Sequence, residues 1–336
     1  MMFSSKVKKF NESGDIILDA SADELLSDGL ALGDAVDVDI GNVSLKSTPV
    51  FSGPYCKSLE TVLIAKNNKV MISVRHGNAE KQYNIPLKSE VKVTLVEPRK
   101  YWEKENAYSF EEINPKTKGR SVESYANFRP LFKNGTYFFR SSSPFDNTYG
   151  RASFAFLCVL KYHIKTIIDV ADSKEDFEVI LNNTAFRRRM AFYFFKIHSI
   201  GDDSGLYSEE FQKTVRSAIM VIKNNDGPFL IHCRAGKRRS GFICAILQGL
   251  AGLDKDEIMS DYMTSYKNNN GVTYEDNPRR YNYLKKDTIE RILTHINGQD
   301  LSNLSHTTEQ YLLKIGISLE EINEIKKKLI NDKSPQ

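Results

Sequence analysis

The stretch FLIHCRAGKRRSG, residues 229–241, decides the fold of the larger part of the chain. It opens on an apolar run that ends at Cys233, continues through a basic turn containing Gly236, and leads after Ser240 into the apolar segment FICAILQGLAGL. An apolar strand that passes through a short turn into an apolar helix is typical of an α/β sheet. The pattern predicts that Cys233 lies where a buried strand ends and the turn begins.

This strand–turn–helix segment suits the binding of a tetrahedral dianion. Backbone N–H groups in a turn before a helix point inward, and the helix dipole adds positive potential. The same field favours the thiolate form of Cys233, and a thiolate can attack phosphorus to form a phosphocysteine. Arg239 offers a planar fork to two phosphoryl oxygens, and Gly236 permits a tight backbone. Ser240 can hydrogen-bond the sulfur and help it leave.

His232, Cys233, Gly236, Arg239 and Ser240 form the pattern HCxxGxxRS. It resembles the HCxxGxxR[ST] signature of the Cys-based protein-tyrosine phosphatase superfamily. The resemblance implies hydrolysis of a phosphate monoester through phospho-Cys233, with no metal and no other cofactor. It also implies that His232 lies beside the nucleophile and helps hold the thiolate, although a buried core histidine is the alternative. The group that would bind the phosphoryl oxygens is the loop itself: Arg234, Ala235, Gly236, Lys237, Arg238 and Arg239.

Other segments extend the resemblance to bacterial tyrosine phosphatases, a branch that includes lipid-active members. Residues 30–95 are similar to the small β-domain at the front of some of these proteins, and also to the C-terminal β-domain of the S-adenosylmethionine hydroxide adenosyltransferases. Arg129 and Arg140 are expected either to support the phosphate loop or to form structural salt bridges. The segments similar to the phosphatase branch are Asn127-Phe128-Arg129, Tyr137 to Pro144, Ile167 to Asp172, and Asp261-Tyr262-Met263 with Tyr266.

One departure from the bacterial pattern concerns the proton donor. The residue before the loop arginine is often Asp in that branch, as in GKDRT, and here it is Arg238. Asp202 and Asp203 are the compensating candidates, because other branches of the superfamily place their general acid on a mobile loop about 30 residues before the cysteine. An ordinary polar turn that caps a helix is the alternative. Asp169 and Asp172 are further candidates, since strand ends in α/β sheets face the ligand crevice.

The substrate interpretation rests on charge around the loop. Arg234, Lys237 and Arg238 add positive charges, as in phosphoinositide phosphatases, although surface cations are usually solvated. The resemblance makes phosphotyrosine protein the first-choice substrate, with dual specificity left open. A phosphoinositide or inositol phosphate is the alternative. A third hypothesis is a catalytically weak pseudophosphatase that binds phosphate, and a fourth gives the β-domain or the C-terminal helices a role in recruiting a partner.

The chain as a whole predicts two domains. Residues 1–115 alternate apolar and polar positions between turn residues, which indicates a small β-barrel-like domain with one helix at 21–32. Residues 116–336 alternate helices with apolar strands, which indicates an α/β domain with a mostly parallel central sheet flanked by helices. Residues 98–125 are interpreted as a connector. The expected elements of the second domain are strands at 166–171, 192–197 and 228–233, and helices at 150–163, 207–223, 240–251, 254–266, 278–297 and within 306–331.

Composition narrows the class of protein further. The 336 residues are 40% hydrophobic and 27% charged, which is ordinary for a globular protein. No apolar run approaches the ~20 residues of a membrane-spanning helix. The four cysteines have no zinc-ligand spacing, and the net charge of +4 is too small to imply nucleic acid. We expect a cytoplasmic location as the sequence stands, or a secreted or surface-associated one if a signal peptide was trimmed. The oligomeric state is left open.

Overall fold

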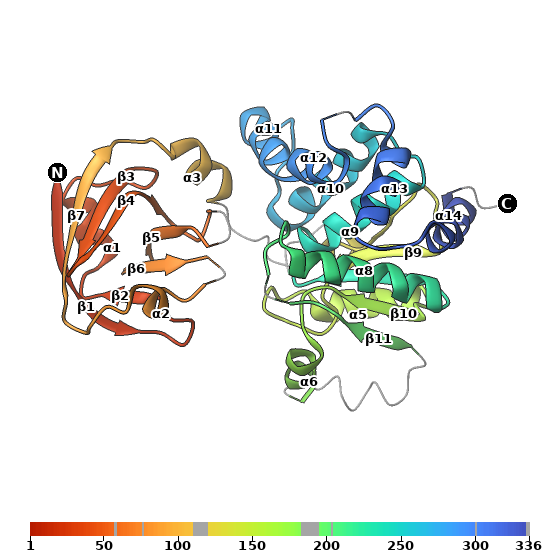
Figure 1. The fold of residues 1–336 in the computed structure, drawn as a ribbon, viewed down its shortest axis with the longest axis horizontal. Helices are drawn as coiled ribbons and strands as arrows, with labels where there is room; N and C mark the ends of the chain where they lie inside the picture. Colours follow the sequence, from red (N-terminus) through yellow and green to blue (C-terminus); the bar gives the residue numbers. More distant parts are fainter. Residues whose placement is uncertain are drawn as a thin grey trace. The chain divides into compact units, whose positions relative to one another are not determined.

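The computed structural model divides the chain into two compact units, Met1–Phe110 and Glu111–Gln336 (Figure 1). The expected boundary at residue 115 lies outside the described residues. The residues that the structure describes are 1–56, 59–75, 77–109, 120–182, 195–202, 204–299 and 301–333.

The first unit is a closed barrel, which confirms the expected β-rich domain. Its neighbouring strands run antiparallel except β4 and β5, which pair in parallel. In β3, Val36, Val38 and Ile40 are buried while Asp37 and Asp39 are more exposed. The period-two pattern of the sequence therefore arises because successive side chains of a strand point to opposite faces. The barrel order is β1 (Met2–Phe10), β2 (Ile16–Leu18), β6 (Lys69–Val74), β5 (Thr61–Lys66), β4 (Val43–Phe51), β3 (Ala35–Ile40) and β7 (Glu90–Glu97).

In the described residues of this unit, three helices accompany the barrel. Helix α1 (Ala22–Ser27) lies within the expected stretch 21–32; it begins at a capping box formed by Ser21 and Glu24 and ends just before Gly29. Helix α2 spans Ala79–Tyr83, and α3 spans Trp102–Tyr108. The interpretation of 98–125 as a connector is therefore wrong over α3 and over α4 (Val122–Tyr125). The carboxylate of Glu105 explains helix α3, because it accepts hydrogen bonds from the backbone N–H and hydroxyl of Ser52 and so fixes α3 to the end of β4.

The second unit contains a five-stranded sheet in the order β11, β10, β12, β9, β8. The first three neighbouring pairs are parallel, and β8 and β9 are antiparallel. The expected strand at 192–197 is displaced to 196–199, and residues 192–194 lie outside the described residues. Strands β8 and β9 were not predicted as strands. The bounds are β8 (Arg129–Pro130), β9 (Phe138–Ser142), β10 (Thr166–Asp169), β11 (Lys196–Ser199) and β12 (Phe229–Cys233).

Helices cover both faces of this sheet, so the expected mixed α/β fold is confirmed in outline. On one face, α5 buries Phe156 against Phe139 and Leu230. On the opposite face, Lys328 of α14 lies over the ring of Phe229. The bounds are α4 (Val122–Tyr125), α5 (Ala152–Lys161), α6 (Lys174–Asn182), α8 (Glu209–Asn224), α9 (Arg239–Leu250), α10 (Lys255–Asn270), α11 (Pro278–Lys285), α12 (Arg291–Asn297), α13 (Leu304–Lys314) and α14 (Leu319–Lys333).

Two of these helices bear on the sequence expectations. Every residue of α9 from Ser240 onward is buried, which explains why its sequence is apolar on all sides. The single helix expected over 278–297 is divided into α11 and α12 by the π-helical segment Lys286–Glu290. That segment carries no proline or glycine, so the sequence gives no signal for the interruption.

The C-terminal helix is tied to the sheet by its polar side chains. The buried carboxylate of Asp332 accepts the backbone N–H groups of Thr136, Tyr137 and Phe138 at 2.6, 2.8 and 3.0 Å. The ammonium of Lys328 donates to three carbonyls at the end of α8. Both contacts satisfy backbone groups that strand and helix ends leave unpaired.

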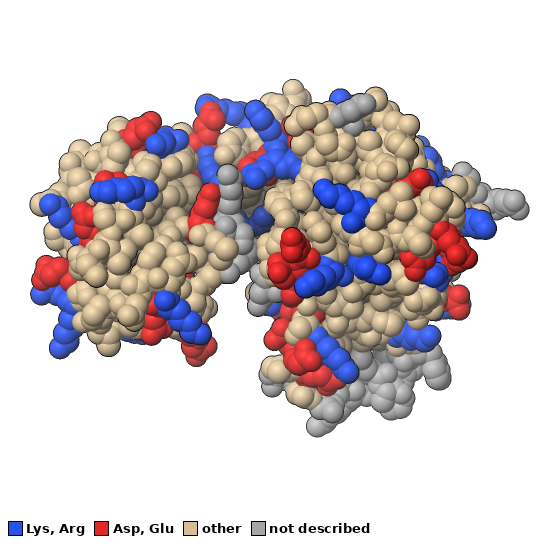
Figure 2. Space-filling model, in the orientation of Figure 1, with Lys and Arg blue, Asp and Glu red and all other residues tan. Residues whose placement is uncertain are grey.

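The surface and composition of the described residues add four findings. On the face shown in Figure 2, Lys and Arg side chains are interspersed with Asp and Glu on each unit. Across the described ranges, no helix is both long and apolar enough to cross a bilayer. In the same ranges, His, Cys, Asp and Glu side chains form no cluster of three or more that would hold a metal ion. All four cysteines are buried free thiols.

Candidate active site

The site begins where β12 ends. Cys233 is the last residue of this strand and is 6% exposed. Its Sγ lies 3.3 Å from the hydroxyl of Ser240, which is buried in the first turn of α9. The structure thus brings together the predicted nucleophile and the hydroxyl predicted to hydrogen-bond it.

The loop between Cys233 and α9 has its carbonyl groups turned outward. Donors outside the loop hydrogen-bond to these carbonyls. The N–H and C=O groups of a trans peptide point in opposite directions, so the N–H groups of Ala235, Lys237 and Arg238 point toward the inside of the loop. This creates the inward N–H groups that an anion requires. The carbonyl contacts are Arg234 with the N–H of Ser143 (3.1 Å), Ala235 with Asn269 (2.9 Å), Gly236 with Asn127 (2.9 Å) and Lys237 with Arg140 (3.3 Å).

The loop backbone requires glycine at position 236. Gly236 has a φ of +64°, a left-handed value that residues with a Cβ rarely adopt. A Cβ added there would lie 2.2 Å from the carbonyl oxygen of Ser141 at the end of β9. The close approach of loop and strand explains the predicted role of this residue.

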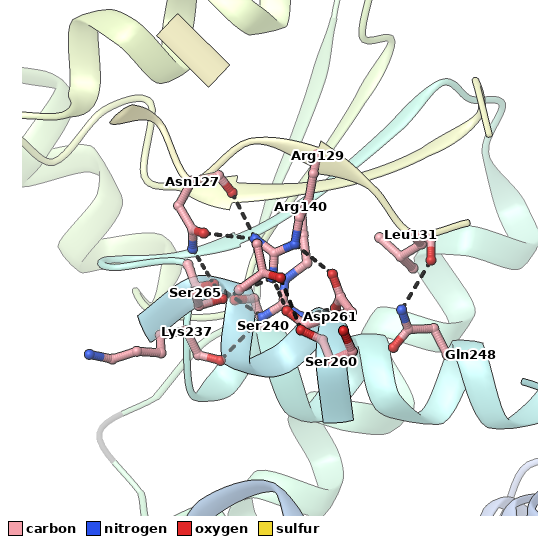
Figure 3. Close-up of polar contacts among 12 residues, drawn as sticks. Asn127, Arg129, Leu131, Arg140, Lys237, Ser240, Gln248, Ser260, Asp261 and Ser265 are labelled. Carbon is pink, nitrogen blue, oxygen red and sulfur yellow. Dashed lines mark hydrogen bonds and ion pairs between the residues drawn. The ribbon is translucent and has the colours of Figure 1, made fainter. Parts of the chain in front are cut away.

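Behind the loop, two arginines share one carboxylate (Figure 3). Asp261 of α10 accepts Nε of Arg129 at 2.5 Å and Nη1 of Arg140 at 2.6 Å. Burial raises the pKa of Asp261, but the two guanidinium groups outweigh burial and hold it below its ordinary value. Arg140 also donates to the carbonyl of Gly236 at 3.1 Å. Both interpretations of Arg140 therefore apply, since it forms a buried ion pair and supports the loop.

The guanidinium of Arg239 binds the backbone of two neighbouring loops. Its Nη1 donates to the carbonyls of Val170 and Ala171 at 3.4 and 3.3 Å, and also to that of Asp202. Its Nη2 donates to the carbonyl of Ser204 at 2.7 Å. Among the residues that the structure describes, none accepts a hydrogen bond from Nε. Arg239 therefore connects the nucleophile's loop to the turn after β10 and to the loop after β11.

Asp202 lies beside Arg239, with its Oδ1 3.8 Å from Nη2. Its carboxylate accepts the N–H of Ser204 at 2.7 Å and the hydroxyl of Thr214 at 3.0 Å. Burial raises the pKa of Asp202, but these hydrogen bonds and the charge of Arg239 hold it below its ordinary value. Asp202 is therefore ionised in this conformation. The other candidate, Asp203, lies outside the described residues.

The remaining basic residues of the loop differ in their surroundings. The Arg234 guanidinium lies 3.2 Å from Asp172 and 3.7 Å from Asp146. Lys237 donates to the side chain of Asn270 at 3.0 Å and lies over the ring of Tyr266. Arg238 is exposed, and within the described part of the chain its side chain forms no hydrogen bond or ion pair. Of the three, Arg238 is the one with a guanidinium available to a ligand.

His232 is fully buried behind Cys233, beside Asp169 of the neighbouring strand. Burial lowers the pKa of His232 to about 3 and raises that of Asp169 to about 7. Burial also raises the pKa of Asp172, together with the charge of Asp169. Asp169 and Asp172 are 0% and 2% exposed, so neither can contact a substrate from its present position.

Sequence reasoning did not single out the side chains that hold the loop carbonyls. Asn127 stands in the quoted NFR segment, and its φ of 51° suits Asn, which tolerates the left-handed region. Asn269 and Ser265 gave no signal, because a polar position on a helix is usually solvated. Their contacts join segments far apart in the sequence.

Comparison with known proteins places the chain in a family. The profile of the tyrosine phosphatase family matches residues 135–331, which is more than half of the chain. The chain therefore belongs to the tyrosine phosphatase family, and the resemblance seen in the sequence is confirmed. The matched range includes the loop, Arg140 and Asp261.

Individual relatives match over short stretches. The triple specificity protein phosphatase PtpB of Mycobacterium tuberculosis is 50% identical over 38 residues, 11% of this chain and 14% of the relative. A tyrosine-protein phosphatase of Nostoc commune is 35% identical over 66 residues, 20% of each protein. The chain thus matches only a small part of the length of these curated relatives.

Solved structures are similar at low identity. The core catalytic domain of the PP-IP phosphatase SIW14 from S. cerevisiae is 18% identical, with a TM-score of 0.30, over 52% of this chain and 95% of that chain. TpbA from P. aeruginosa is 14% identical, also with a TM-score of 0.30, over 52% of this chain and 92% of that chain.

Proposed function

We propose that this protein hydrolyses phosphate monoesters, with phosphotyrosine proteins as its substrates, through a phosphocysteine at Cys233. One observation carries the proposal. The loop after Cys233 has its carbonyls held outward, with Cys233 and Ser240 in contact at its base. An anion bound by the inward N–H groups would lie against the sulfur. Family membership supports the same class of reaction.

The proposed reaction has two steps. The Cys233 thiolate attacks phosphorus, an S–P bond forms, and the bond to the leaving oxygen breaks as a general acid protonates that oxygen. Water then attacks the phosphocysteine, the same group takes a proton from the water, and the S–P bond breaks. In this second step the Ser240 hydroxyl donates a hydrogen bond to the departing sulfur. Arg239 binds equatorial phosphoryl oxygens through Nε–H and the outer N–H of Nη2.

Asp202 or Asp203 is the proposed acid. Asp202 is ionised where it stands, so it has to exchange Ser204 and Thr214 for new surroundings before it can carry a proton. Its loop is bound to Arg239 through the carbonyls of Asp202 and Ser204, so any shift of the guanidinium on binding a phosphoryl group would be transmitted to the loop through those contacts. This coupling would allow the loop to change when a substrate binds.

A phosphoinositide or inositol phosphate is the second candidate substrate. The observation that favours it is the exposed guanidinium of Arg238 beside the loop, which would pair with an additional phosphate. The opposing observation is that Arg234 already faces the carboxylates of Asp172 and Asp146. A pseudophosphatase remains the third candidate, and the intact Cys233–Ser240 contact weighs against it.

The test is phosphate release from a phosphotyrosine peptide and from a soluble phosphoinositide, with Cys233→Ser as the control. We expect faster release from the peptide and none in the control. Arg238→Ala separates the substrates, because it should lower turnover of the phosphoinositide and leave the singly phosphorylated peptide nearly unchanged. Binding of the peptide without release would identify a pseudophosphatase and contradict the proposal.

A further inference from the structure

Asp169 and His232 form a buried polar pair directly behind the nucleophile. They lie opposite each other in the parallel ladder of β10 and β12, and both are 0% exposed. The Asp169 Oδ1 is 3.8 Å from the His232 Nδ1. Within the described residues, neither ring nitrogen of His232 has a hydrogen-bond partner, and neither does Oδ2 of Asp169. A buried polar group without a hydrogen bond lowers the stability of the folded protein, so a hydrogen bond between these groups would be stabilising.

The protonation states of the pair make them complementary. Burial keeps His232 neutral and keeps a proton on the Asp169 carboxyl up to about pH 7. A protonated carboxyl is a hydrogen-bond donor, and a neutral imidazole nitrogen is an acceptor. The other charged groups facing the pair are Arg234, Asp172 and Asp146. Arg234 favours ionisation of Asp169, but burial outweighs it.

Asp169 is also linked to the groups that would bind phosphate. Its Oδ1 accepts the N–H of Ala171 at 2.9 Å, which shapes the turn after β10. The carbonyls of Val170 and Ala171 in that turn accept the guanidinium of Arg239. The next residue, Asp172, holds Arg234 with its side chain and Gly201 with its carbonyl. The turn at 170–172 therefore contacts Arg239, Arg234 at the start of the loop after Cys233, and the separate loop that carries Asp202.

We propose that Asp169 is a positioning residue for Arg239 and Cys233. It contacts no substrate. It fixes the turn at 170–172 by accepting the N–H of Ala171, it lies opposite the His232 ring in the strand ladder, and the turn in turn aims the Arg239 guanidinium. The proposal rests on the proposed function, because that function gives Arg239 its phosphoryl ligand.

The test compares Asp169→Asn with Asp169→Leu in the full chain. Asn retains the oxygen that accepts the Ala171 N–H and supplies an N–H donor toward His232, so it reproduces the protonated carboxyl. Leu has a similar size and removes both the acceptor for the Ala171 N–H and the polar group that faces His232. The probe is sulfate, whose charge is constant between pH 6 and pH 8, and the readout is its protection of Cys233 against alkylation by iodoacetamide. The ratio of protected to unprotected rates removes the effect of thiol ionisation.

At pH 6 we expect Asn to bind sulfate within about threefold of the unmodified protein, and Leu at least about tenfold more weakly, since small misplacements of a binding group are costly. Between pH 6 and pH 8, sulfate binding should weaken more in the unmodified protein than in the Asn variant. The reason is that Asp169 becomes ionised over this range, whereas Asn at the same position cannot. Circular dichroism reports whether each variant folds. If Leu does not fold, the pH comparison with Asn still decides.

Wild-type sulfate affinity in the Leu variant, or equal pH dependence in the Asn variant, would overturn the proposal. The outcome is separate from that of the proposed function. If the unmodified protein binds sulfate but releases no phosphate from a phosphotyrosine peptide, the function fails while the positioning role is still tested by anion binding. With p-nitrophenyl phosphate as substrate, the loss in the Leu variant should lie mainly in KM, as expected for a displaced binding group.

Discussion

Replacing Asp169 with Asn should change how the stability of the second unit depends on pH. The pKa of Asp169 is raised from 3.8 to about 7, so between these values the folded protein holds a proton that the unfolded chain releases. Its contribution therefore falls as pH rises through this window. The pKa of His232 is lowered from 6.5 to about 3, so its contribution rises with pH between these values. In the unmodified protein the two slopes oppose each other between about pH 4 and pH 6.5.

The magnitude follows from the size of the shift in the pKa of Asp169. About three pH units at 1.36 kcal/mol each correspond to about 4 kcal/mol between pH 4 and pH 7. In the Asn variant the free energy of unfolding no longer depends on the titration of residue 169, but it still depends on that of His232. Subtracting the free energy of unfolding of the unmodified protein from that of the variant cancels all other titrating groups. This difference should rise by about 1.4 kcal/mol per pH unit up to about pH 7 and then become constant.

The assay is urea denaturation at several pH values between 4.5 and 8. Circular dichroism reports the helix-rich second unit. The only tryptophan of the chain, Trp102, lies in the first unit, so its fluorescence is an internal control that the substitution should not change. A difference in the free energy of unfolding that stays constant across this range would refute the reasoning, because it would mean that Asp169 is ionised in the folded protein throughout.

Three further predictions concern the loop, the acid and the C-terminal helix. Gly236→Ala should lower kcat/KM with p-nitrophenyl phosphate at least about 100-fold, since it strains the backbone and displaces the loop from β9; near-normal activity would show that the loop tolerates a Cβ. The double substitution Asp202→Ala and Asp203→Ala should lower turnover of alkyl phosphates far more than that of activated aryl phosphates, because only a poor leaving group needs the proton; equal losses would remove both residues as the acid. Asp332→Ala should lower the free energy of unfolding by about 3 kcal/mol, because three backbone N–H groups lose a charged acceptor, and urea denaturation followed by circular dichroism measures it; a change below about 1 kcal/mol would contradict this anchoring role.

The sequence was sufficient for the nucleophile and its immediate frame. The apolar run before Cys233, the turn and the apolar helix are adjacent in the chain, so local patterns determine them. The barrel was likewise predictable, because strands such as β3 and the first half of β7 alternate buried and more exposed residues in a period of two.

The support of the loop could not be predicted, because it depends on contacts between distant segments. Asn127 and Asn269 hold loop carbonyls more than 30 residues away. Nothing in a single polar residue distinguishes this role from exposure to solvent. Helix α3 was missed for a related reason, since its formation depends on the tertiary contact between Glu105 and Ser52. The buried state of Asp169 also required the structure, because a strand-end carboxylate usually faces the ligand crevice.

The central claim is that Cys233 carries the phosphoryl group during turnover. Its most direct test is mass spectrometry of the protein quenched in acid while it turns over a phosphotyrosine peptide. The account predicts a phosphoryl group on the proteolytic fragment that contains Cys233, and its absence in Cys233→Ser together with the loss of phosphate release. Undiminished phosphate release by Cys233→Ser, or turnover with no phosphoryl group on that fragment, would contradict it.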